Sequence, residues 1–347
     1  MEKFKVSVII PVFNAQKFLN NCLNTFKEQT IGFNNIELIF VNDCSTDNTK
    51  KILEEFSAKY SNCKIFNLKE NSGCPSIPLN IGIEQVTSDF LMFMDQDDTY
   101  AENMCEVLYG TIVKSEVDFV MCNHDTLING KSIIMKGKEN FEETFYNPKK
   151  DLEIFKKGYR WDKIFNMSFI KNFNIKNPDS NVLAEDIAFS VNAYLNTNKI
   201  IYLKNFYGYN YNIRESLNKS LSNTVTENMI EKNLKGYYYI AKLVKDKNRY
   251  DVMSILFEGE LKTLLIFFVK LDAKNSEKIK ILNKIYSFEE YLNTPIKFSE
   301  KWAAILNSFI IKRQFKIAVL LSKLIKLIYN LPMIKKIHRN QMQKKLI

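Results

Sequence analysis

Short apolar runs alternate with amphipathic helical patterns through the first 122 residues of the chain. The runs are rich in β-branched and aromatic residues, and the stretches between them repeat apolar side chains at helical spacing, as Phe18, Cys22 and Phe26 do. This alternation predicts an open, doubly wound, mostly parallel α/β sheet with right-handed crossovers. We expect strands at residues 5–12, 36–43, 63–68, 89–95 and 117–123, and helices at residues 15–29, 47–59, 76–86 and 101–115.

The pattern changes twice in the rest of the chain. From about residue 124 to 215 the sequence favours short strands and loops, with strand patterns at residues 199–203 and 206–213. After about residue 222 it is helical almost throughout, and the polar stretch 216–224 marks the change. The sequence therefore predicts two domains, an α/β domain whose two halves meet at residue 123 and an all-helical region, with the bounds 1–220 and 221–347.

Composition and charge add two points. The chain of 347 residues is rich in aromatic side chains and poor in Gly and Pro, as expected of a folded globular protein. Its net charge of +10 is concentrated in one segment: residues 301–347 hold eleven Lys and Arg and no Asp or Glu. The basic character therefore belongs to this C-terminal tail and not to the α/β domain.

Two absences narrow the class of protein. The apolar runs at residues 5–12 and 261–271 are too short for a signal peptide core and a transmembrane helix, respectively. The six cysteines occur singly, without a C-x-x-C pair, which favours reduced thiols over a disulfide framework or a zinc site. We expect a cytoplasmic protein that does not span a membrane.

Acidic residues follow two of the predicted strands. Asp43 and Asp47 come after the second strand, and Asp95, Asp97 and Asp98 come after the fourth. Ligands of an open α/β sheet bind beyond the carboxyl ends of its strands, so neighbouring strands would bring these carboxylates together. Repulsion between clustered carboxylates costs free energy unless a cation or a donor-rich ligand compensates it. The simplest such cation is Mg²⁺ or Mn²⁺ bound together with a diphosphate. A solvated acidic turn and helix cap is the alternative, and the acidic cluster alone leaves both open.

Three segments in order resemble the signatures of family 2 glycosyltransferases with the GT-A fold. They are "VSVIIPVFNAQKFLNNCLNTFKEQT", "IELIFVNDCSTDNT" and "NSGCPSIPLNIGIEQVTSDFLMFMDQDD", and a weaker similarity continues to about residue 215. The resemblance implies an inverting transferase that takes a sugar from a nucleotide sugar, which we expect to be a UDP-sugar, with Mn²⁺ or Mg²⁺ as cofactor. It further implies that residues 1–123 are the nucleotide-binding half and residues 124–220 the acceptor half of a catalytic domain.

The resemblance assigns roles to residues of the donor site. Asp43 would bond the nucleotide base, Asp95 would lie near the ribose and Asp97 would bind the metal. Asp98 would support the turn or share the ion. The other residues that would line the bound nucleotide are Pro11, Phe13, Asn14, Asn71, Gly73 and Gln96.

A second set of matching positions lies in the acceptor half. Asp186, beside Glu185, takes the position of the catalytic base, and a carboxylate within reach of the acceptor hydroxyl can remove its proton. Acids in the first turn of a helix also favour its dipole without any catalytic role, and this alternative stays open. Trp161 either stacks on a sugar or fills the core, and Lys163 either contacts acceptor or phosphate or faces solvent.

Two positions depart from the family pattern. Asn42 precedes Asp43 where an Asp–Asp pair is commoner, and Leu79 stands where the family usually has Arg. A basic group at that position would help to hold the phosphates of the donor. Its absence leaves room for another donor, for a substitute such as Arg160, Lys163 or the basic tail, or for weak activity.

The basic tail carries a separate prediction. The segment "FKIAVLLSKLIKLIYNLPMIKKI" puts Leu, Ile and Val on one side and Lys on the other, a pattern typical of helices that lie on anionic membranes. A helical bundle or an oligomer contact would give the same pattern, so a homo-oligomer stays open. No nucleic-acid recognition motif accompanies the charge, and nucleic acid is not an expected partner.

These features predict a metal-dependent glycosyltransferase at the inner face of a bacterial cytoplasmic membrane. Its acceptor would be a glycan or a lipid-linked molecule in the synthesis of a surface polysaccharide such as capsule or lipopolysaccharide. A nucleotidyltransferase is an alternative, but it normally needs a Gly- and Lys-rich phosphate loop, which this chain lacks near its start. A non-catalytic nucleotide-binding or scaffold protein of the same fold is the other alternative, and Leu79 favours it.

Overall fold

The chain forms two compact units in a computed structural model, which describes residues 4–128, 130–132, 141–213 and 225–330. The first unit comprises residues 1–151, 158–181 and 185–215, and the second comprises residues 152–157, 182–184 and 216–347. Two short segments from within the first stretch of chain thus belong to the second unit. The boundary predicted at residues 216–224 lies outside the described residues.

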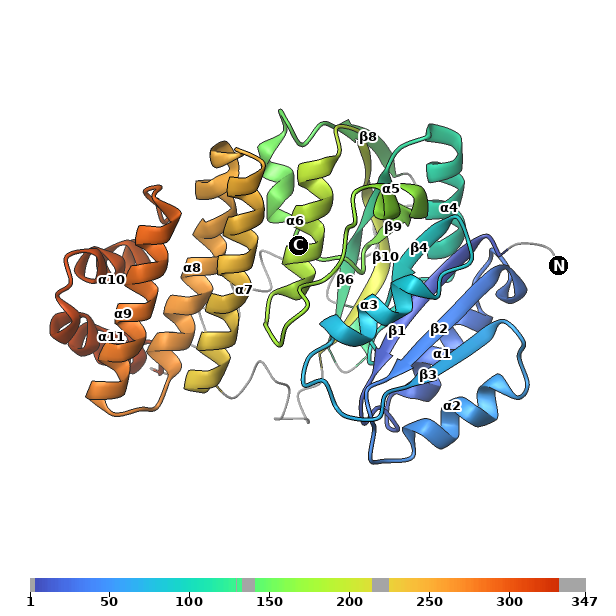
Figure 1. Cartoon of the computed structure of the whole chain (residues 1–347), viewed down its shortest axis with the longest axis horizontal. Coiled ribbons are helices and arrows are strands. Elements are labelled where there is room, and N and C mark those ends of the chain that lie inside the picture. The colour runs from blue at the N-terminus through green and yellow to red at the C-terminus, as the bar shows by residue number, and fades with distance from the viewer. Residues whose placement is uncertain (1–3, 129, 133–140, 214–224, 331–347) are drawn as a thin grey trace. The chain divides into compact units, whose positions relative to one another are not determined.

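The first unit is built on one ten-stranded sheet (Figure 1). Its strands are β1 (Val6–Val12), β2 (Ile36–Asn42), β3 (Cys63–Asn67), β4 (Phe90–Phe93), β5 (Thr99–Tyr100), β6 (Phe119–Ile128), β7 (Lys131–Ser132), β8 (Glu142–Tyr146), β9 (Lys163–Asn166) and β10 (Ile200–Ile213). The order is β3-β2-β1-β4-β9-β6-β10-β5, with β7 paired to β6 and β8 to β10. The predicted α/β fold is confirmed. The first four strands are parallel, whereas β9 runs antiparallel between β4 and β6.

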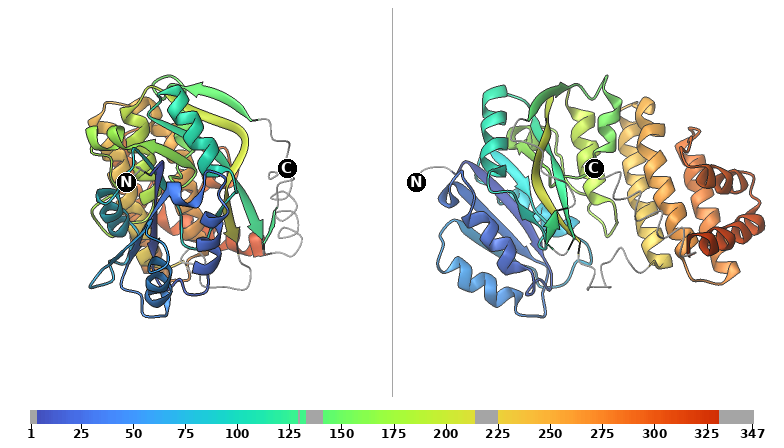
Figure 2. Two further views of the ribbon diagram at one scale, coloured as in Figure 1. Left: turned by 90° about the vertical axis from the view of Figure 1, so that its right-hand side faces the viewer. Right: turned by 180° about the vertical axis from the view of Figure 1, so that it is seen from behind.

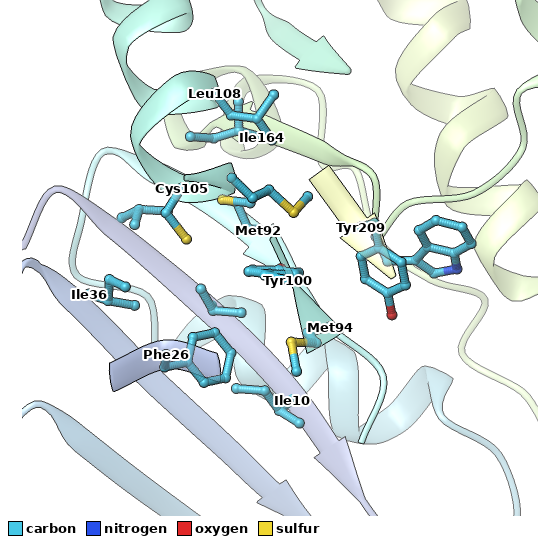
Figure 3. Packing of buried hydrophobic residues seen from close by; sticks show 14 of the residues in the cluster. Ile10, Phe26, Ile36, Met92, Met94, Tyr100, Cys105, Leu108, Ile164 and Tyr209 are labelled. Atoms are coloured by element: carbon cyan, nitrogen blue, oxygen red, sulfur yellow. The ribbon is translucent and has the colours of Figure 1, made fainter. Parts of the chain in front are cut away.

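Helices cover both faces of this sheet. They are α1 (Leu19–Lys27), α2 (Thr49–Ser57), α3 (Ser76–Glu84), α4 (Met104–Ser115), α5 (Met167–Asn172) and α6 (Glu185–Asn196), with a 3₁₀ turn at Phe33–Asn35. On one face, Ile10 of β1 and Met92 of β4 lie in the same buried cluster as Phe26 of α1 and Leu108 of α4 (Figure 3). On the other face α6 contributes Phe189, whose ring lies 5.1 Å from that of Phe93.

Three details differ from the sequence-based expectations. The strands expected at residues 199–203 and 206–213 are one strand, β10, whose register against β6 shifts between Tyr202 and Tyr209. The helix expected from residue 15 begins at Leu19, because residues 15–18 form a turn in which the Ala15 N–H donates to Thr49 Oγ1 at 2.7 Å. The second and fourth strands are not neighbours, since β1 lies between them.

The second unit is helical. Its long elements are α7 (Glu227–Asp246), α8 (Met253–Lys270), α9 (Asn275–Leu292), α10 (Lys301–Ile311) and α11 (Phe315–Asn330), with 3₁₀ turns at Leu152–Lys156 and Tyr250–Val252. Figure 2 shows α7 to α11 in yellow to red. Rings of Tyr237, Phe257 and Phe288 pack edge-on or tilted at 5.3–6.2 Å in its core. Among the described residues, every helix is too short or too polar to traverse a bilayer.

One glycine of this unit has no room for a side chain. A Cβ added to Gly236 in α7 would lie 2.0 Å from the backbone oxygen of Leu183. Gly236→Ala should therefore lower the free energy of unfolding by about 1–3 kcal/mol, the usual cost of overpacking. Gly259→Ala in α8 is the matched control: no atom lies within 4 Å of its added Cβ, so the better helix former should stabilise by up to about 1 kcal/mol. Urea denaturation measures both, and equal effects would contradict the close contact.

Candidate active site

The loop after β1 connects the loops that follow β2 and β4. The Phe13 N–H donates to Gln96 Oε1 at 2.7 Å, and the Phe13 carbonyl accepts from Gln96 Nε2 at 3.1 Å. On the other side the Asn14 N–H donates to Ser45 Oγ at 3.0 Å, and Asn14 Oδ1 accepts from the Thr46 N–H at 2.8 Å. Asn14 adopts the left-handed conformation, with φ of 49°. Phe13, Asn14 and Gln96, all predicted for the donor site, thus lie together at the carboxyl edge of the parallel strands.

Asp43 holds the loop that follows β3. Its Oδ1 accepts from the Ser72 N–H at 2.8 Å, and its Oδ2 accepts from Ser72 Oγ at 2.9 Å and from Asn71 Nδ2 at 3.2 Å. Gly73 follows with φ of 73°, and its N–H donates to Asn71 Oδ1 at 2.9 Å. Three residues predicted for the donor site are therefore brought together. Contact of Asp43 with a nucleotide base stays a prediction, because its oxygens face this loop.

The acids after β4 have different surroundings. Asp97 is exposed, Asp95 is partly buried and Asp98 is buried. Both oxygens of Asp98 accept hydrogen bonds from β10, from the Tyr209 hydroxyl at 2.7 Å and from the Asn212 N–H at 2.8 Å. Burial, together with repulsion from the other two acids, raises the pKa of Asp98 to about 8. Asp98 thus links this turn to β10, and whether it also shares the ion stays open.

A divalent ion at this turn fits the chemistry of the acids. Burial raises the pKa of Asp95 to about 6, and the negative charge of Asp97 adds to the effect. A cation would relieve this repulsion. Within the described part of the chain no three His, Cys, Asp or Glu side chains form a complete metal-binding group. Mg²⁺ is usually held by only one or two carboxylates together with substrate phosphates, so the exposed Asp97 suits an ion that arrives with a diphosphate.

Arg160, which the sequence offered only as one possible substitute for the missing Arg at residue 79, is a main residue of the site. Its side chain is buried, with Nη2 at 3.4 Å from Glu185 Oε1 and Nη1 at 3.5 Å from Asn177 Oδ1. Asp95 and Asp186 also interact electrostatically with the guanidinium. Asp95 after β4 and the two acids that open α6 therefore lie within electrostatic range of one cation. No pattern in the sequence indicated the contacts of Arg160 with acids.

Glu185 and Asp186 occupy the first turn of α6. The preceding residue, Ala184, has φ of 64°, a conformation that a residue with a side chain rarely adopts and that often marks a functional turn. Asp186 is partly exposed, and its Oδ1 accepts from the Ile187 N–H at 2.8 Å. Burial raises the pKa of both carboxyls, that of Glu185 to about 7, while Arg160 acts in the opposite direction.

The structure decides between the alternatives left open for two other predicted residues. Lys163 is fully buried, and its ammonium donates to Asp162 Oδ1 at 2.6 Å and to the Tyr159 carbonyl. The alternative that Lys163 faces solvent is wrong, because the folded chain supplies a buried counter-charge. Trp161 is only 5% exposed and stacks on Tyr209 at 4.0 Å between ring centroids, so it belongs to the core. Leu79 is fully buried in α3.

The fold and the acids at its carboxyl edge define an α/β domain of the GT-A glycosyltransferase class. A crystal structure of S. aureus TarS 1-349 in complex with UDP-GlcNAc matches this chain with a TM-score of 0.71 at 23% sequence identity. The match covers 92% of this chain and 91% of that one, and it shows a shared fold. Residues 7–171 match the model of the family described as glycosyl transferase family 2. The chain is thus similar to this family over just under half of its length.

Two curated relatives extend over most of the chain. The poly(ribitol-phosphate) beta-glucosyltransferase of Bacillus spizizenii is 27% identical over 322 residues, which are 88% of this chain and 45% of that protein. The poly(ribitol-phosphate) beta-N-acetylglucosaminyltransferase TarS of Staphylococcus aureus is 26% identical over 314 residues, which are 88% of this chain and 49% of that protein. This chain spans about half the length of both relatives.

Proposed function

We propose that this chain transfers a sugar from a UDP-sugar to a hydroxyl group of a polymer acceptor, with inversion at the anomeric carbon. The observation that supports the proposal best is the shared cation: Arg160 pairs with Glu185 and interacts with Asp95 and Asp186. The acid next to the expected donor and the expected base thus lie around one guanidinium. A single displacement needs the donor and the base near the same sugar carbon, on opposite sides of it, and acids near one cation are compatible with this requirement.

Each site residue has a role in this proposal. Asp97 would hold a divalent ion, Mn²⁺ or Mg²⁺, which when bound supplies positive charge to the diphosphate leaving group. Asp186 would take the proton from the acceptor hydroxyl as it attacks. Asp95 would lie near the ribose. The residues that would line the rest of the nucleotide are Pro11, Phe13, Asn14, Asp43, Asn71, Gly73 and Gln96.

The relatives favour a particular class of substrates. Their names give glucose and N-acetylglucosamine as the sugars and poly(ribitol-phosphate) as the acceptor, and TarS has been crystallised with UDP-GlcNAc. We therefore propose UDP-glucose or UDP-N-acetylglucosamine as donor, and a surface polymer, such as a poly(alditol phosphate) or a lipid-linked glycan, as acceptor. Metal dependence, acceptor and inversion are parts of the same proposal.

A screen of nucleotide sugars with and without Mn²⁺ tests the function. We expect release of UDP from UDP-glucose or UDP-N-acetylglucosamine, faster with Mn²⁺ and with a polymer acceptor, and thermal stabilisation by the same donor. A nucleotidyltransferase would instead release pyrophosphate from a nucleoside triphosphate and a sugar phosphate. Stabilisation by UDP without release from any donor would favour the non-catalytic alternative and would contradict the proposal.

We also propose that α11 brings the protein to an anionic membrane. This helix is apolar on two opposite faces, although only one of them packs inside its unit: Ala318, Val319 and Ile325 are buried. The outer face is a stripe at spacings of three and four residues, formed by Ile317, Leu320, Leu324 and Leu327, which are 46%, 65%, 53% and 67% exposed. Exposed lysines at residues 316 and 323 accompany it, and residues 301–330 contain no acid. Apolar contact with charge of this sign suits a bilayer rich in anionic lipids.

Vesicle cosedimentation tests this membrane proposal. Replacing Leu320 and Leu324 by Glu should reduce binding to vesicles rich in phosphatidylglycerol by at least about tenfold, because burial of two large apolar side chains is lost. The control is Val113→Glu, which changes an exposed apolar residue of α4 in the other unit and should leave binding unchanged. Unchanged vesicle binding of the double variant would contradict the proposal. The proposal would also be contradicted if the unsubstituted protein formed a concentration-dependent dimer that the double variant did not form, because the exposed face of α11 would then be a dimer contact.

A further inference from the structure

Four aromatic rings of the first unit lie nearly parallel. Trp161 is the central ring, with Tyr209 at 4.0 Å and 24° and Tyr159 at 4.6 Å and 18°. Tyr211 lies at 6.3 Å from Trp161, tilted by only 6°. Trp161 and Tyr209 are buried, but Tyr159 is 44% and Tyr211 41% exposed. The rings that reach solvent are therefore the two outer tyrosines.

This aromatic stack is attached to the acidic turn after β4. The Tyr209 hydroxyl donates to Asp98 Oδ2 at 2.7 Å and accepts from the Asp95 N–H at 3.2 Å. Asn212, which follows Tyr211 in β10, donates its N–H to Asp98 Oδ1 at 2.8 Å and its side-chain amide to the Asp97 carbonyl at 3.1 Å. The β10 end of the stack, with Tyr209 and Tyr211, is consequently next to the turn expected to hold the diphosphate of the donor.

A polar group borders the stack. The imidazole of His124, at the centre of β6, meets Tyr159 at 5.5 Å and Trp161 at 5.0 Å, edge-on in both cases. A flat apolar surface bordered by a hydrogen-bonding side chain suits a ligand that has C–H groups on one face and hydroxyl groups at its edge. Saccharides and polyols have this character.

We propose that the exposed rings of Tyr159 and Tyr211, each nearly parallel to Trp161, form a binding platform for a saccharide or polyol unit of the acceptor. The inference rests on the proposed function and changes one expectation, because the sugar would contact the outer tyrosines and not Trp161 itself. The acceptor is favoured over the donor sugar because the rings come from β10 and from the segment before β9. The loops after β1, β2 and β3, where the nucleotide is expected, contribute none of them.

Matched substitutions test the platform. Tyr159→Leu and Tyr211→Leu should each raise the KM for the acceptor by about three- to tenfold, the range expected for loss of one aromatic contact. Tyr159→Phe and Tyr211→Phe keep the ring and should stay within about twofold of the unsubstituted protein. The KM for the UDP-sugar should rise less than the KM for the acceptor. An unchanged acceptor KM in both Leu variants, or a donor KM raised as much as the acceptor KM, would overturn the platform.

Fluorescence separates failure of the platform from failure of the proposed function. The chain has two tryptophans, so in a Trp302→Phe variant the emission reports on Trp161 alone. Titration with ribitol 5-phosphate and with poly(ribitol-phosphate) should change this emission, and Tyr211→Leu should abolish the change even if no transfer is detected. Transfer without any change in emission, or no response to either probe, would count against the platform.

Discussion

Asp186→Asn should lower kcat for sugar transfer by about 10²- to 10⁴-fold, the usual contribution of a general base. The amide keeps the shape and polarity of the side chain at the start of α6 but does not accept the proton of the acceptor hydroxyl. Affinity for UDP should stay the same, because Asp186 is assigned to the acceptor side. Steady-state transfer and calorimetric titration of UDP measure the two effects separately.

Two controls make this prediction specific to Asp186. Glu185→Gln alters the neighbouring acid, which pairs with Arg160, and should reduce transfer less than Asp186→Asn does. Glu54→Gln, on the exposed side of α2, should leave transfer and UDP affinity unchanged. If Asp186→Asn retains full activity, the base is another residue. If it loses UDP binding as well, Asp186 acts on the donor side.

Arg160→Gln should destabilise the protein and shift the pH dependence of transfer. The change leaves buried carboxylates without their cation, which typically costs about 3–5 kcal/mol of unfolding free energy. Burial raises the pKa of Glu185 and of Asp186, and Arg160 opposes this rise, so its removal should raise both pKa values further. A base must be ionised, and transfer should therefore fall off at a higher pH as the solution is acidified. Denaturant unfolding and a pH profile of kcat/KM measure the two effects.

The double variant Arg160→Gln with Glu185→Gln separates the structural effect from the catalytic one. Removing one acid together with the cation should restore much of the unfolding free energy, because fewer buried charges are left unpaired. The acidic limb of the pH profile should remain shifted, since Asp186 still lacks the guanidinium. A profile identical to that of the unsubstituted protein in both variants would show that Arg160 has a purely structural role.

The sequence predicted the parallel half of the sheet and missed part of the rest, for a physical reason. Every residue of β2 and all but one residue of β1 are buried. Strands buried on both faces appear in the sequence as nearly continuous apolar runs. β9 has only four residues, Lys163–Asn166, and its first residue is the polar Lys163, so no apolar run in the sequence predicts this strand. The order of the strands depends on which surfaces pack together. Periodicity therefore did not predict that β9 separates β4 from β6.

The candidate site shows the same limit. Asp95, Asp97 and Asp98 are adjacent in the chain, and the acidic turn could be recognised from their spacing alone. The different surroundings of these three acids could not be predicted from the sequence. The groups that donate hydrogen bonds to Asp98 come from β10, 111 and 114 residues further along the chain. The cation shared by Glu185 and Asp186 is likewise fixed by packing. Local sequence thus identifies chemical groups, whereas tertiary contacts decide which of them are paired.

Calorimetric titration of UDP with and without Mn²⁺ shows whether a carboxylate after β4 holds a divalent ion against the diphosphate of a nucleotide sugar. We predict that UDP binds at least about tenfold more tightly with Mn²⁺, a difference of about 1.4 kcal/mol, and that Asp97→Asn removes this gain. Equal affinity with and without Mn²⁺, or a gain that persists in Asp97→Asn, would contradict the account.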